Sequence, residues 1–539
     1  TMINNHMLRI GALFLLTVLS YGFYNAYLPI TDPVESNYVL SAITMLKHNS
    51  WISPMIYDQV WYDKPPLTYW ALMISYKLFG ISDFTSRIPN TLIAGGSVAL
   101  MYHLVYRIKE STHIAVTSAI LLFSALQFWY ISHAVITDGF LFFFSLAIFG
   151  YAYLAFTKND KHSMVKAYGA AALAVVTKGP VGIVLPGLIL LLFLAARWFT
   201  QKDMKDYSLA KDITLLFNPF GILLFIVLGS PWYIAMYSIH GQEFISGFLG
   251  LHNMERALVS EHPKFNVWYY YLIIVPLSLL PWTPAIIYRL KGITWKNNFY
   301  LLGAIWFVVI VLFYSLVATK YITYTLPAII PCLIWGAEAI TTTFHNKSSS
   351  FKYIVTIPLG IYTILFLVAS IATPELNPIP LISAFVLLVL FALVVKRYRN
   401  RNVPLSICLA TPLTILYTAI TITVTPILSD QSGLQFKPFI ESSAQHTYIY
   451  GTYYTSIVYY TKDTPTQVFV HTTDNPVWTA GKTLMPTITV EEFDTRVSTE
   501  KGATIIVPNK YSKEFTNSPT NNIATEVGKT KSASIYKIQ

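Results

Sequence analysis

The sequence predicts a polytopic α-helical membrane protein with about 13 transmembrane helices and a small C-terminal α/β domain. Of its 539 residues, 54% are hydrophobic and only 12% are charged, whereas a soluble protein carries about 25% charged residues. Apolar runs long enough to cross a hydrocarbon core of about 30 Å recur up to residue 426, and short β-type runs follow them. We therefore expect a transmembrane domain over residues 1–426 and an extracytoplasmic domain over residues 427–539.

The loops between the predicted spans set the orientation. With the N-terminus in the cytoplasm, the inside loops contain about 19 of the 37 lysines and arginines, as the positive-inside rule requires. The net charge of +11 is therefore a topology signal, and we expect no nucleic-acid partner. The odd number of spans places the C-terminus outside the plasma membrane. The predicted spans are 10–29, 88–106, 113–131, 137–156, 164–177, 180–197, 215–238, 267–288, 299–318, 322–341, 352–372, 379–395 and 405–426.

The outer face receives two large pieces, the loop 31–87 and the tail, together with a smaller piece at 239–266. Apolar residues recur at helical spacing at 39–46 and again at 67–79. This spacing predicts two short amphipathic helices in the interface plane, with their apolar faces among lipid headgroups.

The tail has a different periodicity. Short β-type runs alternate with helix-like stretches, which predicts a small α/β domain. Because it contains no Gly-rich phosphate loop, we interpret it as a recognition or scaffolding module. The β-type runs are 447–450, 467–470, 487–490, 504–507 and 533–536, and the helix-like stretches are 453–460 and 490–498.

The sequence offers little for a metal centre. Both cysteines, Cys332 and Cys408, lie in apolar spans and are expected to be core residues. The histidines do not have the spacing of a zinc site. We therefore expect no metal ligands in the active site.

Ionisable residues gather at the predicted outer boundary of the membrane, where they are costly and usually functional. Asp32 and Glu35 begin the first loop, and Asp63 and Lys64 lie at its centre. Such cations and carboxylates suit a reaction in which a lipid phosphate leaves and a hydroxyl nucleophile needs a base. The others at this boundary are Arg87, Asp138, Lys178, His252, Asn253, Arg256, His262, Lys320 and Tyr324.

Most of these residues have a structural alternative. Glu35 could cap the helix predicted after it, and Asp63 could simply pair with Lys64. Arg87 and Lys178 could anchor span ends by snorkelling to headgroups, and the two histidines could be polar loop residues. Asp32 and Lys64 are the hardest to explain structurally, because each lies beside a proline in a loop next to the membrane.

Nine motifs, in order along the chain, resemble the protein O-mannosyltransferase / lipid A aminoarabinose transferase superfamily. The resemblance is strong over about residues 8–345 and looser over the tail. The motifs are Asp32-x-x-Glu35-x-x-Tyr38, Tyr62-Asp63-Lys64-Pro65-Pro66-Leu67-x-Tyr69-Trp70, Ser86-Arg87-Ile88-Pro89, Thr137-Asp138-Gly139, Thr177-Lys178-Gly179-Pro180, Pro231-Trp232-Tyr233, His252-Asn253-x-x-Arg256, Leu280-Pro281-Trp282 and Thr319-Lys320-Tyr321-x-x-Tyr324-x-Leu326-Pro327.

The resemblance implies the GT-C glycosyltransferase fold. It also implies an inverting transfer of sugar from a polyprenyl (undecaprenyl) monophosphate carrier, with no cofactor or divalent metal required. Aminoarabinose transferases typically read Asp-Glu-x-Arg-Tyr in the first loop, whereas Val34 and Asn37 stand at the Asp and Arg positions here. The resemblance therefore supports the chemistry and leaves the acceptor open among a lipid glycan, a cell-wall polymer and a protein.

The mechanism we expect is a single displacement at the anomeric carbon. Asp32 or Glu35 takes the proton of the acceptor hydroxyl, and Asp138 orients the lysines or the sugar. Cations and one tyrosine hold the departing lipid phosphate. The expected phosphate-binding residues are Lys64, Arg87, Arg256, Lys320 and Tyr324, and the other pocket residues are Asp63, Lys178, His252, Asn253 and His262.

Two other classes of protein fit the sequence less well. A lipid-linked sugar transporter or flippase without transferase activity would need inverted repeats and midplane charges. A membrane sensor would not need Asp63-Lys64-Pro65-Pro66 in its first loop. We therefore expect a monomeric enzyme whose partners are the sugar donor, the acceptor and the bilayer.

Overall fold

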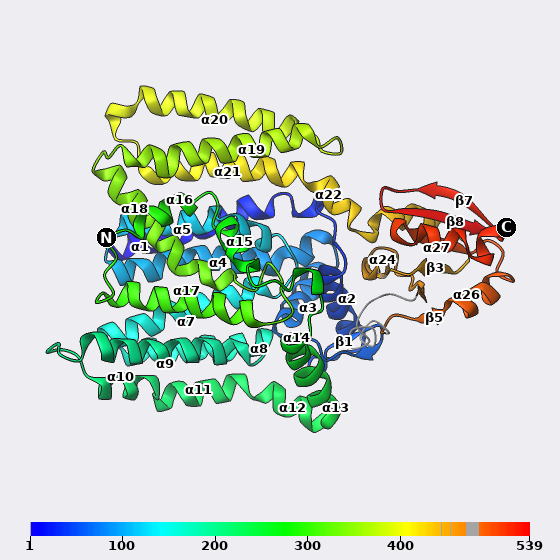
Figure 1. Cartoon of the computed structure of the whole chain (residues 1–539), viewed down its shortest axis with the longest axis horizontal. Coiled ribbons are helices and arrows are strands. Elements are labelled where there is room, and N and C mark those ends of the chain that lie inside the picture. Colours follow the sequence, from blue (N-terminus) through cyan, green and yellow to red (C-terminus); the bar gives the residue numbers. More distant parts are fainter. Residues whose placement is uncertain (1, 444, 453, 471–483) are drawn as a thin grey trace. The chain divides into compact units, whose positions relative to one another are not determined.

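The computed structural model describes residues 2–443, 445–452, 454–470 and 484–539, which form two compact units (Figure 1). The membrane unit consists of residues 1–24, 62–68 and 87–423, and the tail unit of residues 25–61, 69–86 and 424–539. The border at 423/424 lies close to the boundary expected from the sequence. The first outer loop was expected to belong to the membrane domain, but most of it belongs to the tail unit.

The described residues of the membrane unit form helices and the loops between them, without a strand. Ten of its described helical segments are long and apolar enough to cross a membrane, or up to 12 if each of two bent pairs forms one span. The chain is thus a multi-pass membrane protein. Its helices are α1 (Met2–Gly22), α4 (Asp83–Lys109), α5 (Thr112–Ser124), α6 (Leu126–Ser132), α7 (Asp138–Lys158), α8 (Lys161–Lys178), α9 (Val181–Gln201), α10 (Leu209–Leu216), α11 (Pro219–Gly229), α12 (Pro231–His240), α13 (Gln242–Phe244), α14 (Arg256–Leu258), α15 (Tyr270–Ser278), α16 (Thr283–Arg289), α17 (Asn298–Leu316), α18 (Ile329–His345), α19 (Ile357–Ala372), α20 (Ile379–Arg397) and α21 (Leu405–Thr423).

Helix α8 lies where the predicted span 164–177 is, but it is not among the ten segments and it contains three lysines. It packs against α7, α9 and α11 and is rich in buried alanines. A Cβ on Gly182 of α9 would lie 2.6 Å from the backbone carbonyl carbon of Ala174, and Gly229 of α11 approaches Ala172. Small residues therefore allow α8 to pack closely among its neighbours, and its surroundings are protein more than lipid.

Other helices of the membrane unit face outward. Helices α19, α20 and α21 run side by side (Figure 1), and α20 packs mainly against α21. The apolar side chains of α20, including Val386, Leu390 and Leu393, are mostly exposed. These side chains suit contact with lipid tails, where a helix satisfies its own backbone hydrogen bonds.

The tail unit contains a six-stranded sheet with the order β5-β4-β3-β6-β8-β7. The neighbouring strands β5, β4, β3 and β6 pair in parallel. Strand β8 pairs antiparallel with both β6 and β7. The predicted α/β domain is therefore confirmed. The sequence missed one edge strand, β7, because its residues are mostly exposed and it has a bulge at Glu526/Gly528. The strands are β3 (Thr447–Tyr450), β4 (Thr466–Phe469), β5 (Thr487–Thr489), β6 (Thr504–Pro508), β7 (Ala524–Lys529) and β8 (Ala533–Ile538).

Helices and a hairpin from the first outer loop complete the tail unit. Helix α2 lies where predicted, but it packs on α24 and β1, so placing its apolar face in lipid headgroups was wrong. Its buried residues include Ser36, Ser41 and Thr44, so the covered surface extends beyond its apolar stripe. The elements are α2 (Val34–Lys47), β1 (Met55–Ile56), β2 (Gln59–Val60), α3 (Leu67–Phe79), α22 (Thr425–Asp430), α23 (Lys437–Glu441), α24 (Thr455–Thr461), α26 (Val490–Val497) and α27 (Ser512–Thr516).

The close packing of α8 on α9 can be tested with two glycines of α9. We expect Gly182→Ala to destabilise the protein by about 1–3 kcal/mol, because the new methyl group would meet backbone atoms that cannot rotate away. Gly187→Ala is the matched control, since its Cβ would meet no atom within 4 Å and alanine favours a helix. Thermal unfolding in detergent should show a lower Tm for the first variant alone. Equal Tm values would contradict this packing.

Candidate active site

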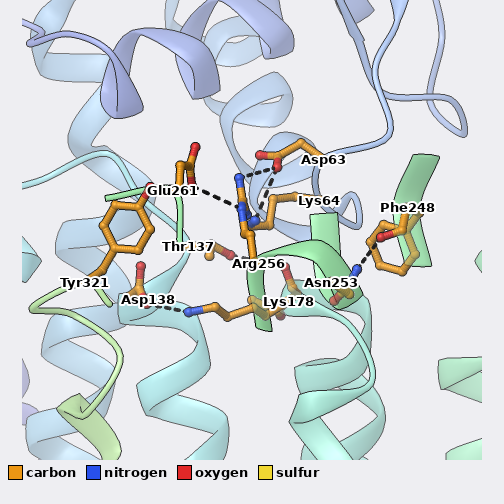
Figure 2. Close-up of polar contacts among 11 residues, drawn as sticks. Asp63, Lys64, Thr137, Asp138, Lys178, Phe248, Asn253, Arg256, Glu261 and Tyr321 are labelled. Carbon is orange, nitrogen blue, oxygen red and sulfur yellow. Dashed lines mark hydrogen bonds and ion pairs between the residues drawn. The ribbon is translucent and has the colours of Figure 1, made fainter. Parts of the chain in front are cut away.

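Charged side chains from two segments of the membrane unit meet at Asp63 (Figure 2). Asp63 lies with Lys64 in the loop between β2 and α3. Its Oδ1 accepts a hydrogen bond of 3.1 Å from Nη2 of Arg256, which begins α14, and lies 3.5 Å from Nζ of Lys64. The side chains of Asp63 and Lys64 are only 12% and 13% exposed. One carboxylate thus holds two cations together in a place with little water.

A second ion pair joins the ends of two packed helices. Asp138 is the first residue of α7 and Lys178 the last residue of α8, and their Oδ1 and Nζ atoms are 2.9 Å apart. Each charge lies at the helix end whose dipole favours it. The Nζ of Lys178 also lies 4.5 Å from the ring centroid of Tyr324, in cation–π geometry. Lys178 therefore lies in the cluster, as predicted, and the alternative of snorkelling to headgroups does not describe it.

Threonines lie at the same helix ends. The hydroxyl of Thr137, directly before α7, shares a 2.8 Å hydrogen bond with Thr68 of α3. It also donates to the carbonyl oxygen of Thr177, directly before Lys178, at 3.2 Å. The loop that carries Lys64 is thereby connected to the ends of α7 and α8.

The third outer piece contributes a carboxylate that the sequence analysis missed. Glu261 Oε2 lies 3.4 Å from Nε of Arg256 and accepts a 2.8 Å hydrogen bond from the hydroxyl of Tyr321. The same hydroxyl lies 3.0 Å from Nε2 of His262. Tyr321 stands in the motif Thr319-Lys320-Tyr321, which could have identified it, whereas the only signal for Glu261 is its place next to His262.

Burial governs the titration of this cluster. It lowers the pKa of Lys64 to about 8, although the neighbouring Asp63 opposes the shift. Burial also acts to lower the pKa of Arg256, but Asp63 and Glu261 outweigh it and hold the pKa above its usual value. Burial raises the pKa of the Tyr324 phenol, which keeps it a neutral hydrogen-bond donor. Burial therefore makes the Lys64 ammonium easier to deprotonate than an ordinary lysine, while Arg256 keeps its charge.

The structure places two predicted phosphate-binding residues in other contacts. Arg87 is 1% exposed, and its Nε donates a 2.9 Å hydrogen bond to the carbonyl oxygen of His133, so the alternative of snorkelling to headgroups is wrong. The Nζ of Lys320 donates to Oδ1 of Asn266 at 2.6 Å and to the carbonyl oxygen of Val317 at 2.7 Å. Burial lowers the pKa of Lys320. These hydrogen bonds join Arg87 and Lys320 to groups other than Asp63, Asp138 and Glu261.

Two further predicted residues lie in the π-helix Ile245–Glu255 of the membrane unit. The Nδ2 of Asn253 donates to the carbonyl oxygen of Phe248 (Figure 2), which gives it a role within its own segment. The side chain of His252 lies outside the described residues.

The two candidate bases belong to the tail unit. Oδ1 of Asp32 accepts a 2.9 Å hydrogen bond from the backbone N–H of Ser456, and Oδ2 accepts one from the Ser456 hydroxyl. Burial raises the pKa of Asp32 to about 6 against the lowering effect of these bonds. Glu35 accepts a 2.7 Å hydrogen bond from the Thr31 hydroxyl and a longer one of 3.4 Å from the Thr31 N–H. Glu35 therefore bonds back to Thr31 just before α2, and among the described residues no side-chain hydrogen bond caps the start of this helix.

No group of three or more His, Cys, Asp or Glu side chains in the described part of the chain is arranged to hold a metal ion. Metal-free catalysis stays a prediction.

Comparison with known proteins relates the chain to glycosyltransferases. The family described as Dolichyl-phosphate-mannose-protein mannosyltransferase matches residues 28–245. An uncharacterized protein of Aquifex aeolicus is 30% identical over 373 residues, which cover 67% of this chain and 69% of that protein. The undecaprenyl phosphate-alpha-4-amino-4-deoxy-L-arabinose arabinosyl transferase of Shewanella sediminis is 25% identical over 328 residues, which cover 60% of this chain and 58% of the transferase.

Among solved structures, the crystal structure of ArnT from Cupriavidus metallidurans bound to undecaprenyl phosphate is similar in fold. The two chains are 19% identical, with a TM-score of 0.77, and the match covers 97% of each. The likeness therefore extends over both units of the chain and confirms the predicted GT-C fold.

Proposed function

The chain belongs to the protein O-mannosyltransferase / lipid A aminoarabinose transferase superfamily of GT-C glycosyltransferases, and we propose that it moves a sugar from undecaprenyl monophosphate to a hydroxyl of a cell-envelope acceptor. The observation that carries this proposal is the cluster of Lys64, Lys178 and Arg256 around Asp63 and Asp138. Ammonium and guanidinium groups are the side chains suited to phosphate oxygens.

The cluster suits the leaving group of this reaction. The donor is a phosphodiester with one negative charge, and the polyprenyl phosphate that leaves gains a second. Lys64 and Arg256, which Asp63 holds in place beforehand, face this developing charge, so they stabilise the transition state more than the ground state. Tyr324, whose ring faces the ammonium of Lys178, donates a hydrogen bond from its neutral hydroxyl to the leaving phosphate. Arg87 and Lys320 are not assigned to the phosphate, because both side chains are buried and hydrogen-bonded to other groups.

We assign the general base to Asp32. The acceptor oxygen attacks the anomeric carbon from the face opposite the phosphate, the bond to the phosphate oxygen breaks, and the acceptor proton passes to the carboxylate. A pKa of about 6 suits this role, since the group is ionised at neutral pH yet holds a proton readily. Glu35 is engaged with Thr31, and Val34 takes the place of the family's aspartate, so Asp32 is the better candidate.

The remaining assignments are part of the same proposal. The enzyme acts as a monomer on the outer face of the plasma membrane and needs no divalent metal. Its acceptor is a lipid glycan, a cell-wall polymer or a protein side chain. Asp32 and the cation cluster are assigned to one reaction by their chemistry and by the family.

The test is transfer by purified protein in nanodiscs. Undecaprenyl phosphate that carries labelled 4-amino-4-deoxy-arabinose or mannose is offered with a cell-envelope extract, and the release of water-soluble labelled sugar is followed as well. We expect turnover with one of the donors, unchanged by EDTA, and a loss of about 10²–10³ in rate for Lys64→Ala. Lys77→Ala, at an exposed lysine of α3, is the matched control. A folded Lys64→Ala variant with parental turnover would contradict the proposed role, and lipid translocation without transfer would favour a flippase.

The lowered pKa of Lys64 predicts a pH dependence of lipid binding. Above about pH 8 the free site loses this positive charge, so we expect the Kd for undecaprenyl phosphate to rise by up to about tenfold per pH unit. Lys64→Arg keeps its charge at these pH values and should remove the dependence. Intrinsic tryptophan fluorescence can follow the titration. Identical pH profiles for the two proteins would show that Lys64 does not control binding.

The proposed topology predicts that the tail unit is reachable from outside. Ser498 is exposed in the turn after α26, and the only native cysteines, Cys332 and Cys408, lie in membrane helices. We expect Ser498→Cys to react with a membrane-impermeant maleimide in intact spheroplasts, whereas the parent protein should not. Labelling of the variant only after lysis would place the tail in the cytoplasm.

A further inference from the structure

The sheet of the tail unit is wound in both directions from β3. The strands β4 and β5 lie on one side of β3, and β6 lies on its other side and pairs with β8. In open α/β sheets of this kind, functional groups are held outside the carboxyl ends of the strands where the order reverses, here β3 and β6.

At this position the chain holds one of its own carboxylates. Gly451 directly follows β3, and a Cβ there would lie 2.6 Å from the ring of Tyr511, which follows β6. Helix α24 begins shortly afterwards at Thr455, and Ser456 in its first turn is fully buried. The partner of Ser456 is Asp32, which lies 424 positions earlier in the sequence.

Ser456 has its hydroxyl aligned by a second neighbour. The backbone N–H of Gly433, in the 3-10 helix Gly433–Phe436, donates to Oγ of Ser456 at 2.7 Å. An oxygen that accepts this bond directs its own hydrogen elsewhere, and here it donates to Oδ2 of Asp32. The backbone N–H of Ser456 donates to Oδ1 of Asp32. One residue of the tail therefore binds both oxygens of the Asp32 carboxylate.

We propose that Ser456 is a positioning residue for sugar transfer, which holds the Asp32 carboxylate oriented and ionised so that the tail domain takes part in catalysis. This inference rests on the proposed function, in which Asp32 is the base. It gives the tail a task that its sequence alone did not indicate.

Other titratable side chains lie on the elements around Asp32. On α2, Glu35 is bonded to Thr31. Before α24, burial raises the pKa of Tyr454 to about 12, so this phenol stays neutral. On α22, Asp430 pairs with Lys531 at 3.2 Å, and the neighbouring Gln431 carbonyl accepts the N–H of Asp32. A change in the acid limb of the pH profile after substitution of Ser456 would therefore report on Asp32.

The experiment compares two hydroxyls of α24 that both contact the first outer loop. Ser456→Ala removes the bond to Asp32, and Thr455→Val removes the equally buried 2.7 Å bond to the Tyr57 hydroxyl. The readout is the pH profile of labelled sugar release from the undecaprenyl-phosphate donor. Loss of one hydrogen bond to a charged group should move the acid limb of Ser456→Ala up by about one pH unit, with the KM for the donor unchanged. Thr455→Val should keep the parental limb.

Further variants separate the possible outcomes. Ser456→Cys keeps nearly the same volume with a weaker donor and should shift the limb in the same direction, which covers the case that Ser456→Ala does not fold. An unmoved limb in a folded Ser456 variant, with Asp32→Asn inactive, would overturn this inference and leave the base assignment intact. An active Asp32→Asn with the parental limb would overturn both.

Discussion

The membrane unit depends on a balance of charge. Three cations and three carboxylates lie where little water can solvate them, and an unpaired charge there would cost several kcal/mol, about 3–5 by analogy with other buried pairs. Pairing therefore decides where the backbone runs. Asp63 ties its loop to α14, and Asp138 ties α7 to the end of α8.

The tail unit has its own organising element in the seven-residue helix α24. Its hydroxyl and backbone groups reach three separate points of the first outer loop. Thr455 bonds to Tyr57, Ser456 to Asp32, and Tyr459 and Tyr460 both donate to Asp83 at about 3 Å. A helix this short has little stability of its own, so these contacts and the cover of α2 stabilise it. The loop and the tail thereby form one folding unit, although the sequence separates them by the whole membrane domain.

Much of the fold was readable from the sequence, because span length, loop charge and strand periodicity are local signals. The site was readable where a charge lies at a span end, as with Asp138 and Lys178. Long-range pairing was not readable: no local pattern shows that Glu261 approaches Arg256 or that the ammonium of Lys320 is held by Asn266. The partner of α2 was missed for the same reason, since an apolar stripe looks alike whether protein or lipid covers it.

The alanine-rich character of α8 has a consequence for biogenesis. Alanine and glycine contribute little to partitioning into a bilayer, and α8 also contains Lys161, Lys166 and Lys178, so the isolated segment is a poor substrate for the insertion machinery. Its entry into the membrane then depends on the helices that flank it during synthesis. Correct insertion of α8 and formation of the Asp138–Lys178 pair are therefore coupled. A chain in which α7 and α8 do not pack together cannot complete the cluster of cations around Asp63 and Asp138.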